Sequence, residues 1–159
     1  VVIALASVQP HHLYVASDIS ANAIQVARQN AQRHGLVPVI RFLVGDWFRP
    51  FKPDDIRFDL IVSNPPYIQR SLIDDLQPEI VKFEPRRALD GGENGLRCLE
   101  RIISEAHRHL TETGTLLLEI GYDQREAIAD IAARRRWYEQ PEFYKDYAGH
   151  DRVVEIKRR

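Results

Sequence analysis

The sequence has one cysteine, no long apolar run and no excess of charge of either sign, and each absence excludes a class of protein. Cys98 alone can form neither an intrachain disulfide nor a multi-thiolate metal site. No stretch approaches the roughly 20 apolar residues of a membrane span, and no basic-then-apolar signal segment opens the chain. The 22 Lys and Arg against 23 Asp and Glu leave a formal charge of -1, unlike a dedicated nucleic-acid binder. We therefore expect a cytoplasmic protein that binds neither membranes nor nucleic acid directly.

What is present fits one domain of the α/β class. With 159 residues the chain can bury a core without disulfides. Apolar β-type runs alternate with helical patterns, and no repeat or low-complexity linker interrupts them, which indicates a largely parallel sheet. Strands are predicted at residues 13–17, 40–44, 58–62 and 115–120, and a closing hairpin at residues 141–145 and 153–156.

Helical patterns fill most segments between these strands. Residues 1–8 read as most of a short helix. Ser20 can cap the next helix, which should end near Gly35, a good left-handed cap residue. A later helix is predicted at residues 123–135.

One helix has a particularly regular apolar pattern. From Gly95, apolar residues recur at spacings of three and four as far as Leu110, which predicts an amphipathic helix that Gly114 terminates. Cys98 falls within this pattern, so we expect it to pack in the core.

The most informative feature is Asn64-Pro65-Pro66-Tyr67, directly after the apolar run 58–63. Because proline has no backbone N–H, this corner offers the Asn64 side-chain oxygen and the Pro65 carbonyl as acceptors with little internal competition. A planar amino group with two N–H donors fits it. The alternative is a proline-rich turn that only ends a strand.

With this motif the sequence resembles the class I S-adenosylmethionine-dependent methyltransferases that methylate an amide nitrogen or an exocyclic base amine. The resemblance implies a doubly wound, mostly parallel Rossmann-like sheet ending in an antiparallel hairpin, with S-adenosylmethionine as cofactor. In that family a first strand and a glycine-rich loop precede the first helix, whereas this chain starts at Val1 inside that helix. We therefore expect residues 1–159 to be a partial methyltransferase domain in which that strand and loop are absent.

The resemblance implies catalytic roles for Asn64, Pro65 and Tyr67, and it implies that all four motif residues contact the substrate. The Asn64 oxygen and the Pro65 carbonyl would each accept one N–H and turn the nitrogen towards the methyl group. Tyr67 would lie against the planar group. Asn64 is also expected to contact the cofactor, and no metal is expected.

Two acidic positions complete the expected cofactor site. Asp18 stands at a strand end, where a doubly wound sheet places an acid that binds a ribose diol. Its alternative role is an Asx-type cap for the following helix. Asp46 would accept from the adenine amino group while Trp47 covers the ring; the alternatives are a loop acid and a core aromatic residue.

Two further segments narrow the substrate. Residues 84–96 and the closing Lys145-Asp146-Tyr147-Ala148-Gly149-His150-Asp151-Arg152 resemble the protein-glutamine N5-methyltransferases that act on peptide chain release factors. The resemblance implies methylation of the glutamine in the Gly-Gly-Gln loop of a release factor, which would be the partner. The alternatives are a ribosomal-protein glutamine, an amino group of DNA or RNA, and a non-catalytic remnant that lacks normal cofactor binding.

Overall fold

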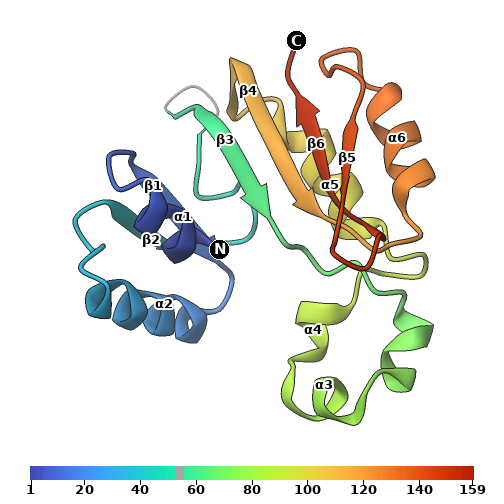
Figure 1. The fold of residues 1–159 in the computed structure, drawn as a ribbon, viewed down its shortest axis with the longest axis horizontal. Coiled ribbons are helices and arrows are strands. Elements are labelled where there is room, and N and C mark those ends of the chain that lie inside the picture. Colours follow the sequence, from blue (N-terminus) through green and yellow to red (C-terminus); the bar gives the residue numbers. More distant parts are fainter. Residues whose placement is uncertain (53–55) are drawn as a thin grey trace. The chain divides into compact units, whose positions relative to one another are not determined.

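The structure, a computed structural model, describes residues 1–52 and 56–159 and divides into two compact units, Val1–Lys52 (unit 1) and Pro53–Arg159 (unit 2) (Figure 1). Each unit has its own sheet, and each is described by itself below. None of the helices in the described ranges has the length and apolar character that crossing a bilayer requires.

Unit 1 is a parallel strand pair with two helices. The two strands are in register, with Tyr14 opposite Ile40. Ser20 caps the second helix as predicted, because its Oγ accepts a hydrogen bond from the Ala23 N–H at 3.3 Å. Gly35 follows the helix end with a φ of +69°, in the left-handed region that favours glycine. The elements are α1 (Val2–Val8), β1 (Tyr14–Asp18), α2 (Ala21–Arg33) and β2 (Ile40–Val44).

Unit 2 contains a four-stranded mixed sheet in the order β3-β4-β6-β5. The β3–β4 pair is parallel, and the β4–β6 and β5–β6 pairs are antiparallel. Its strands are β3 (Phe58–Ser63), β4 (Leu110–Glu119), β5 (Glu142–Lys145) and β6 (Asp151–Lys157). Its helices are the 3-10 helix η1 (Arg70–Asp75), α3 (Pro78–Phe83), α4 (Arg86–Leu89), α5 (Arg97–Ala106) and α6 (Arg125–Ala133).

The predicted α/β class, the parallel pairs and the C-terminal hairpin are confirmed. The extent of the fifth helix was wrong, since α5 ends at Ala106 and Leu110 begins β4 instead of closing the helix. A buried position fits either a helix or a strand, and here strand pairing decides: the Phe58 N–H donates to the His109 carbonyl at 2.8 Å. Gly114 consequently lies inside β4 and terminates no helix.

The core of unit 2 lies between the sheet and α5 and α6. Cys98 is buried on α5, as its place in the apolar pattern predicted. Most of the largest fully buried side chains come from α5, β4, α6 and β6, and these include Leu99, Ile102, Ile103, Leu116, Leu118, Ile128 and Ile156. This packing holds the sheet in place, and the candidate site lies where β3 and β4 end.

Candidate active site

The Asn64 corner begins where β3 ends. Ser63, the last strand residue, pairs with Leu118 of β4. Asn64 is exposed, while the next residue, Pro65, is buried. Among the described residues, no donor forms a hydrogen bond with the Asn64 side chain or with the Pro65 carbonyl. Both predicted acceptors of the corner are therefore uncommitted within the described chain.

Tyr67 is tied by its phenol to the end of β4. The hydroxyl donates to Oε1 of Glu119, the last residue of that strand, at 3.0 Å. Burial raises the pKa of the Tyr67 phenol most, and the Glu119 carboxylate raises it further. The Arg152 guanidinium acts in the opposite direction and lowers this pKa. The phenol therefore stays protonated at neutral pH and remains a donor to Glu119.

Gln124 connects the motif to two other segments. Its side chain is buried, and its Nε2 donates to the carbonyls of Tyr67 at 2.9 Å and of Gly95 at 3.2 Å. Its Oε1 accepts from the Gly121 N–H at 2.9 Å. Sequence analysis missed this residue, because a glutamine near the start of a helix is usually on the surface and gives no signal of its own.

Gly95 is required by the same arrangement. Its φ is +74°, and a Cβ added there would lie 2.7 Å from Gln124 Nε2 and closer still to the Tyr67 carbonyl oxygen. A side chain at this position would therefore push the Tyr67 backbone away from Gln124.

The predicted segment at residues 84–96 runs beside the motif. Ile68 and Asp90 form a parallel bridge, in which the Ile68 N–H donates to the Leu89 carbonyl at 3.1 Å. Asp90 Oδ1 accepts from the Gly92 N–H at 2.8 Å, and its Oδ2 accepts from Arg70 Nε at 3.1 Å. The Gly92 N–H is the main cause that lowers the pKa of Asp90, and Arg70 adds to it.

The closing segment folds onto the same strand end. Asp146 Oδ1 accepts from the N–H groups of Ala148 and His150, each at 3.0 Å, and shapes the turn between β5 and β6. The His150 N–H is the largest cause that lowers the pKa of Asp146. Arg152 pairs with Asp146 at 3.3 Å and donates from Nη1 to the Ile120 carbonyl at 3.3 Å.

Three segments that are far apart in the sequence thus meet at the carboxyl end of β4. Figure 1 shows β3 and β4 pointing the same way, and the turn between β5 and β6 lies at that end of the sheet. The sequence identified each segment separately. It gave no sign that Glu119, Gln124 and Arg152 would join them.

The predicted cofactor acids lie in unit 1, at the carboxyl ends of its paired strands. Asp18 Oδ1 accepts a hydrogen bond from the Ser20 N–H at 2.7 Å. One carboxylate oxygen therefore forms the Asx-type turn that was the alternative role of Asp18. The Gly45 N–H donates to the Asp18 carbonyl at 3.0 Å and keeps the two strand ends together. Asp46 pairs with Arg49 at 3.3 Å. Trp47 has a positive φ of 52°, rare for a bulky residue.

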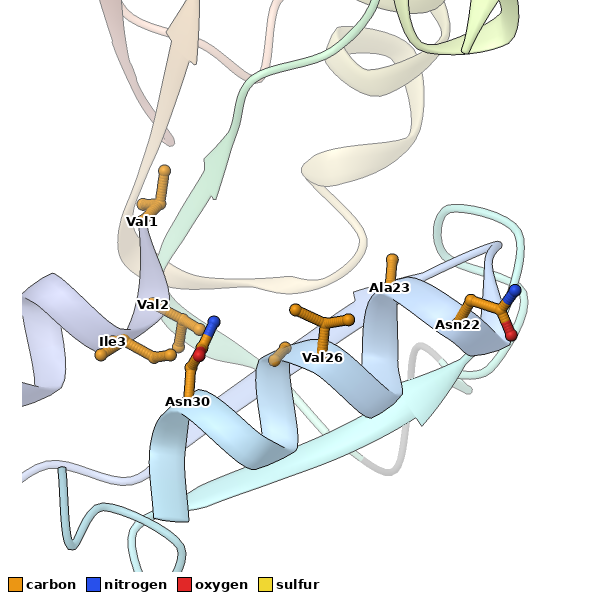
Figure 2. Close-up of a pocket in the computed structure, with 8 residues that line it drawn as sticks. Val1, Val2, Ile3, Asn22, Ala23, Val26 and Asn30 are labelled. Atoms are coloured by element: carbon orange, nitrogen blue, oxygen red, sulfur yellow. The ribbon is translucent and has the colours of Figure 1, made fainter. Parts of the chain in front are cut away.

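A groove elsewhere on unit 1 contains none of the predicted site residues. It is lined by α1 and α2, and Figure 2 shows Val2 and Ile3 close to Asn30, with Val26 further along α2. Its lining is aliphatic apart from two asparagines and has no acidic or basic side chain. This groove therefore offers no acid, base or nucleophile for catalysis.

Comparison with known proteins gives consistent matches. A family model described as a methyltransferase domain matches residues 1–156. The release factor glutamine methyltransferase of Thermosynechococcus vestitus is 40% identical over 154 residues, covering 97% of this chain and 53% of that protein. That of Agrobacterium fabrum is 41% identical over 144 residues, covering 91% and 48%. The chain thus spans about half the length of these curated relatives.

Among solved structures, a methyltransferase from Pyrococcus furiosus has a TM-score of 0.64 and 20% identity, and the match covers 91% of this chain and 61% of that one. This is a likeness of fold, and it agrees with a class I methyltransferase architecture.

Proposed function

Because the chain belongs to the methyltransferase domain family, we propose that it transfers a methyl group from S-adenosylmethionine to the side-chain amide nitrogen of a glutamine in a peptide chain release factor. The observation that carries the proposal is the Asn64 corner: two uncommitted acceptors stand beside Tyr67, whose backbone and phenol are both held. Both units belong to one methyltransferase domain in this proposal, supported by the match over residues 1–156. A release factor works at the ribosome, so the proposal includes a cytoplasmic location.

The chain's part in the reaction is orientation and polarisation. S-adenosylmethionine, when bound, would supply a methyl group from its sulfonium, so that the N–CH3 bond forms as the S–CH3 bond breaks and a neutral thioether leaves. The amide nitrogen then loses one of its protons, which becomes acidic once the methyl group is attached. An amide nitrogen is a poor nucleophile because its lone pair is delocalised into the carbonyl. The Asn64 oxygen and the Pro65 carbonyl each accept one N–H of the acceptor, which turns the nitrogen and favours the positive charge developing on it. Tyr67 lies against the planar amide and fixes its tilt.

The residues proposed to hold the cofactor are Asp18, Asp46, Trp47 and Asn64, and the geometry of unit 1 fits that role. Asp18 is exposed, and only its Oδ1 is engaged within the described chain. Its other oxygen can accept from a ribose hydroxyl, since a carboxylate offers about four acceptor sites. Asp46 and Trp47 follow β2, the strand paired with the one that ends in Asp18.

Replacing Asp18 by alanine is expected to weaken cofactor binding by roughly 2 kcal/mol, because two hydroxyls lose a charged acceptor. Calorimetric titration of the natural-length protein with S-adenosylmethionine measures it. Asp18→Asn is the control, since an asparagine oxygen can still accept from the Ser20 N–H. If Asp18 only shapes the turn, alanine will lower stability, and neither variant will change cofactor affinity.

The proposed acceptor is a protein because the arginines beside the corner are already paired. Arg70 contacts Asp90 at 3.1 Å and Arg152 contacts Asp146 at 3.3 Å. A nucleic-acid channel needs cations that are free to bind phosphates. The names of the relatives from Thermosynechococcus vestitus and Agrobacterium fabrum support a release factor rather than a ribosomal protein.

Radiolabelled S-adenosylmethionine should label a purified release factor on glutamine when the natural-length protein is added. Ribosomal protein, DNA and RNA are offered separately and should stay unlabelled. A release factor whose Gly-Gly-Gln glutamine is replaced by alanine is the matched control and should not be labelled. Label in nucleic acid but not in protein would mean that the substrate is a nucleic acid. No transfer to any acceptor would favour the alternative of a non-catalytic remnant.

A further inference from the structure

The proposed reaction leaves the role of Glu119 unassigned. Glu119 is the half-buried last residue of β4, between Leu118 and Ile120, which are both fully buried. Alternation along a strand turns its side chain to the opposite face from these two apolar neighbours. On that face its carboxylate accepts a hydrogen bond from the Tyr67 hydroxyl at 3.0 Å.

The backbone at Glu119 and at the next residue is held by the β6 side of the sheet. It pairs with Val153 in the antiparallel ladder between β4 and β6. The following residue, Ile120, donates its N–H to the Arg152 carbonyl at 3.0 Å and accepts from Arg152 Nη1. Arg152 is in turn paired with Asp146 in the closing segment. The carboxylate of Glu119 therefore projects from a rigid strand end, which suits a group that orients another side chain.

Tyr67 needs such a group because its backbone alone does not set its ring. Gln124 holds the Tyr67 carbonyl at 2.9 Å, which fixes the main chain but leaves two side-chain torsions free. A hydrogen bond at the far end of the ring restricts both torsions at once. With the carbonyl and the hydroxyl both held, the plane of the ring is determined.

We propose that Glu119 is a positioning residue, which acts through its hydrogen bond to Tyr67 to fix the tilt of the ring against the acceptor amide. The role rests on the proposed function, because the ring must bear on an acceptor amide. This role also explains the position of the closing segment, because Asp146 and Arg152 stabilise the strand end that carries Glu119.

The kinetic test compares Glu119→Ala, Glu119→Gln and Tyr67→Phe. Glu119→Ala should lower kcat about tenfold with the cofactor KM unchanged, the loss expected for one hydrogen bond to a charged group. Glu119→Gln keeps an acceptor oxygen and should remain within about threefold of the wild type. Combining Glu119→Ala with Tyr67→Phe should cost no more than Tyr67→Phe alone, because both remove the same bond.

Glu155→Ala is the matched control. On the hairpin, the Glu155 carboxylate accepts a hydrogen bond from the Tyr144 hydroxyl at 2.6 Å. The substitution therefore removes a similar tyrosine–glutamate hydrogen bond outside the site. Its kcat should equal that of the wild type. Wild-type kcat in Glu119→Ala would overturn the proposal, and so would a loss in Glu119→Gln as large as in Glu119→Ala, because that loss would indicate a need for the charge.

A measurement without substrate separates this inference from the proposed function. NMR of isotopically labelled tyrosine, with the Tyr67 signal assigned through Tyr67→Phe, follows the titration of that phenol. Glu119→Ala should bring the Tyr67 pKa nearer to its ordinary value, since the Glu119 hydrogen bond is one cause of the raised pKa. An unchanged titration would overturn the inference even if the release factor is methylated. A changed titration with no methylation of release factor by the wild type would overturn the proposed function, and with it the positioning role of Glu119 in that reaction.

Discussion

Replacing Asn64 by alanine is expected to lower the rate of methyl transfer on the order of a hundredfold, because one charge-stabilising hydrogen bond in the transition state is lost. The Asn64 side chain forms no hydrogen bond with another described residue, so alanine leaves no partner unsatisfied. Folding stability should therefore change little. Cofactor affinity should fall much less than the rate, because the side-chain oxygen orients the acceptor amide and three other residues are also proposed to hold the cofactor.

A turnover assay with release factor and a calorimetric titration with S-adenosylmethionine, both on the natural-length protein, measure these effects. Asn30→Ala is the control, since Asn30 lies on α2 in the groove of unit 1 and carries no proposed role. It should turn over at the wild-type rate. Wild-type turnover in Asn64→Ala would remove the corner from the mechanism and leave a turn that only ends β3.

Gly95→Ala is expected to lower the free energy of unfolding by about 3 kcal/mol, from a left-handed φ and a backbone collision together. The new Cβ would lie 2.7 Å from Gln124 Nε2, which cannot move without leaving the Tyr67 carbonyl. Turnover should also fall, since the displaced backbone carries the tyrosine ring.

Chemical denaturation of Gly95→Ala and Gly35→Ala separates the two contributions. Gly35 has a φ of +69°, but a Cβ there would meet nothing within 4 Å. Its substitution should cost only the left-handed strain, about 1–2 kcal/mol, and leave turnover unchanged. Equal losses of stability in the two variants would mean that the close contact of Gly95 with Tyr67 and Gln124 contributes nothing to the free energy of unfolding.

Local patterns predicted the elements that depend on local physics. The strand at residues 40–44 was found within its predicted bounds, and Ser20 caps α2 through its hydroxyl. The helix from Gly95 was predicted to run beyond Ala106, because its apolar spacing continues to Leu110. Spacing reports only which positions are buried, and Leu110 is buried by strand pairing with Phe58 rather than by a helix.

The sequence by itself determined the α/β class and the acceptor corner, because two prolines remove backbone donors wherever the chain places them. It also identified the acid at the end of β1, although the Asx turn to Ser20 became visible only in the structure. Only the tertiary structure decided what holds the corner. Tyr67 bonds to Glu119, 52 residues away, and to Gln124, 57 residues away. Such pairs depend on how strands register and where they end, which hydrophobic periodicity within one segment does not encode.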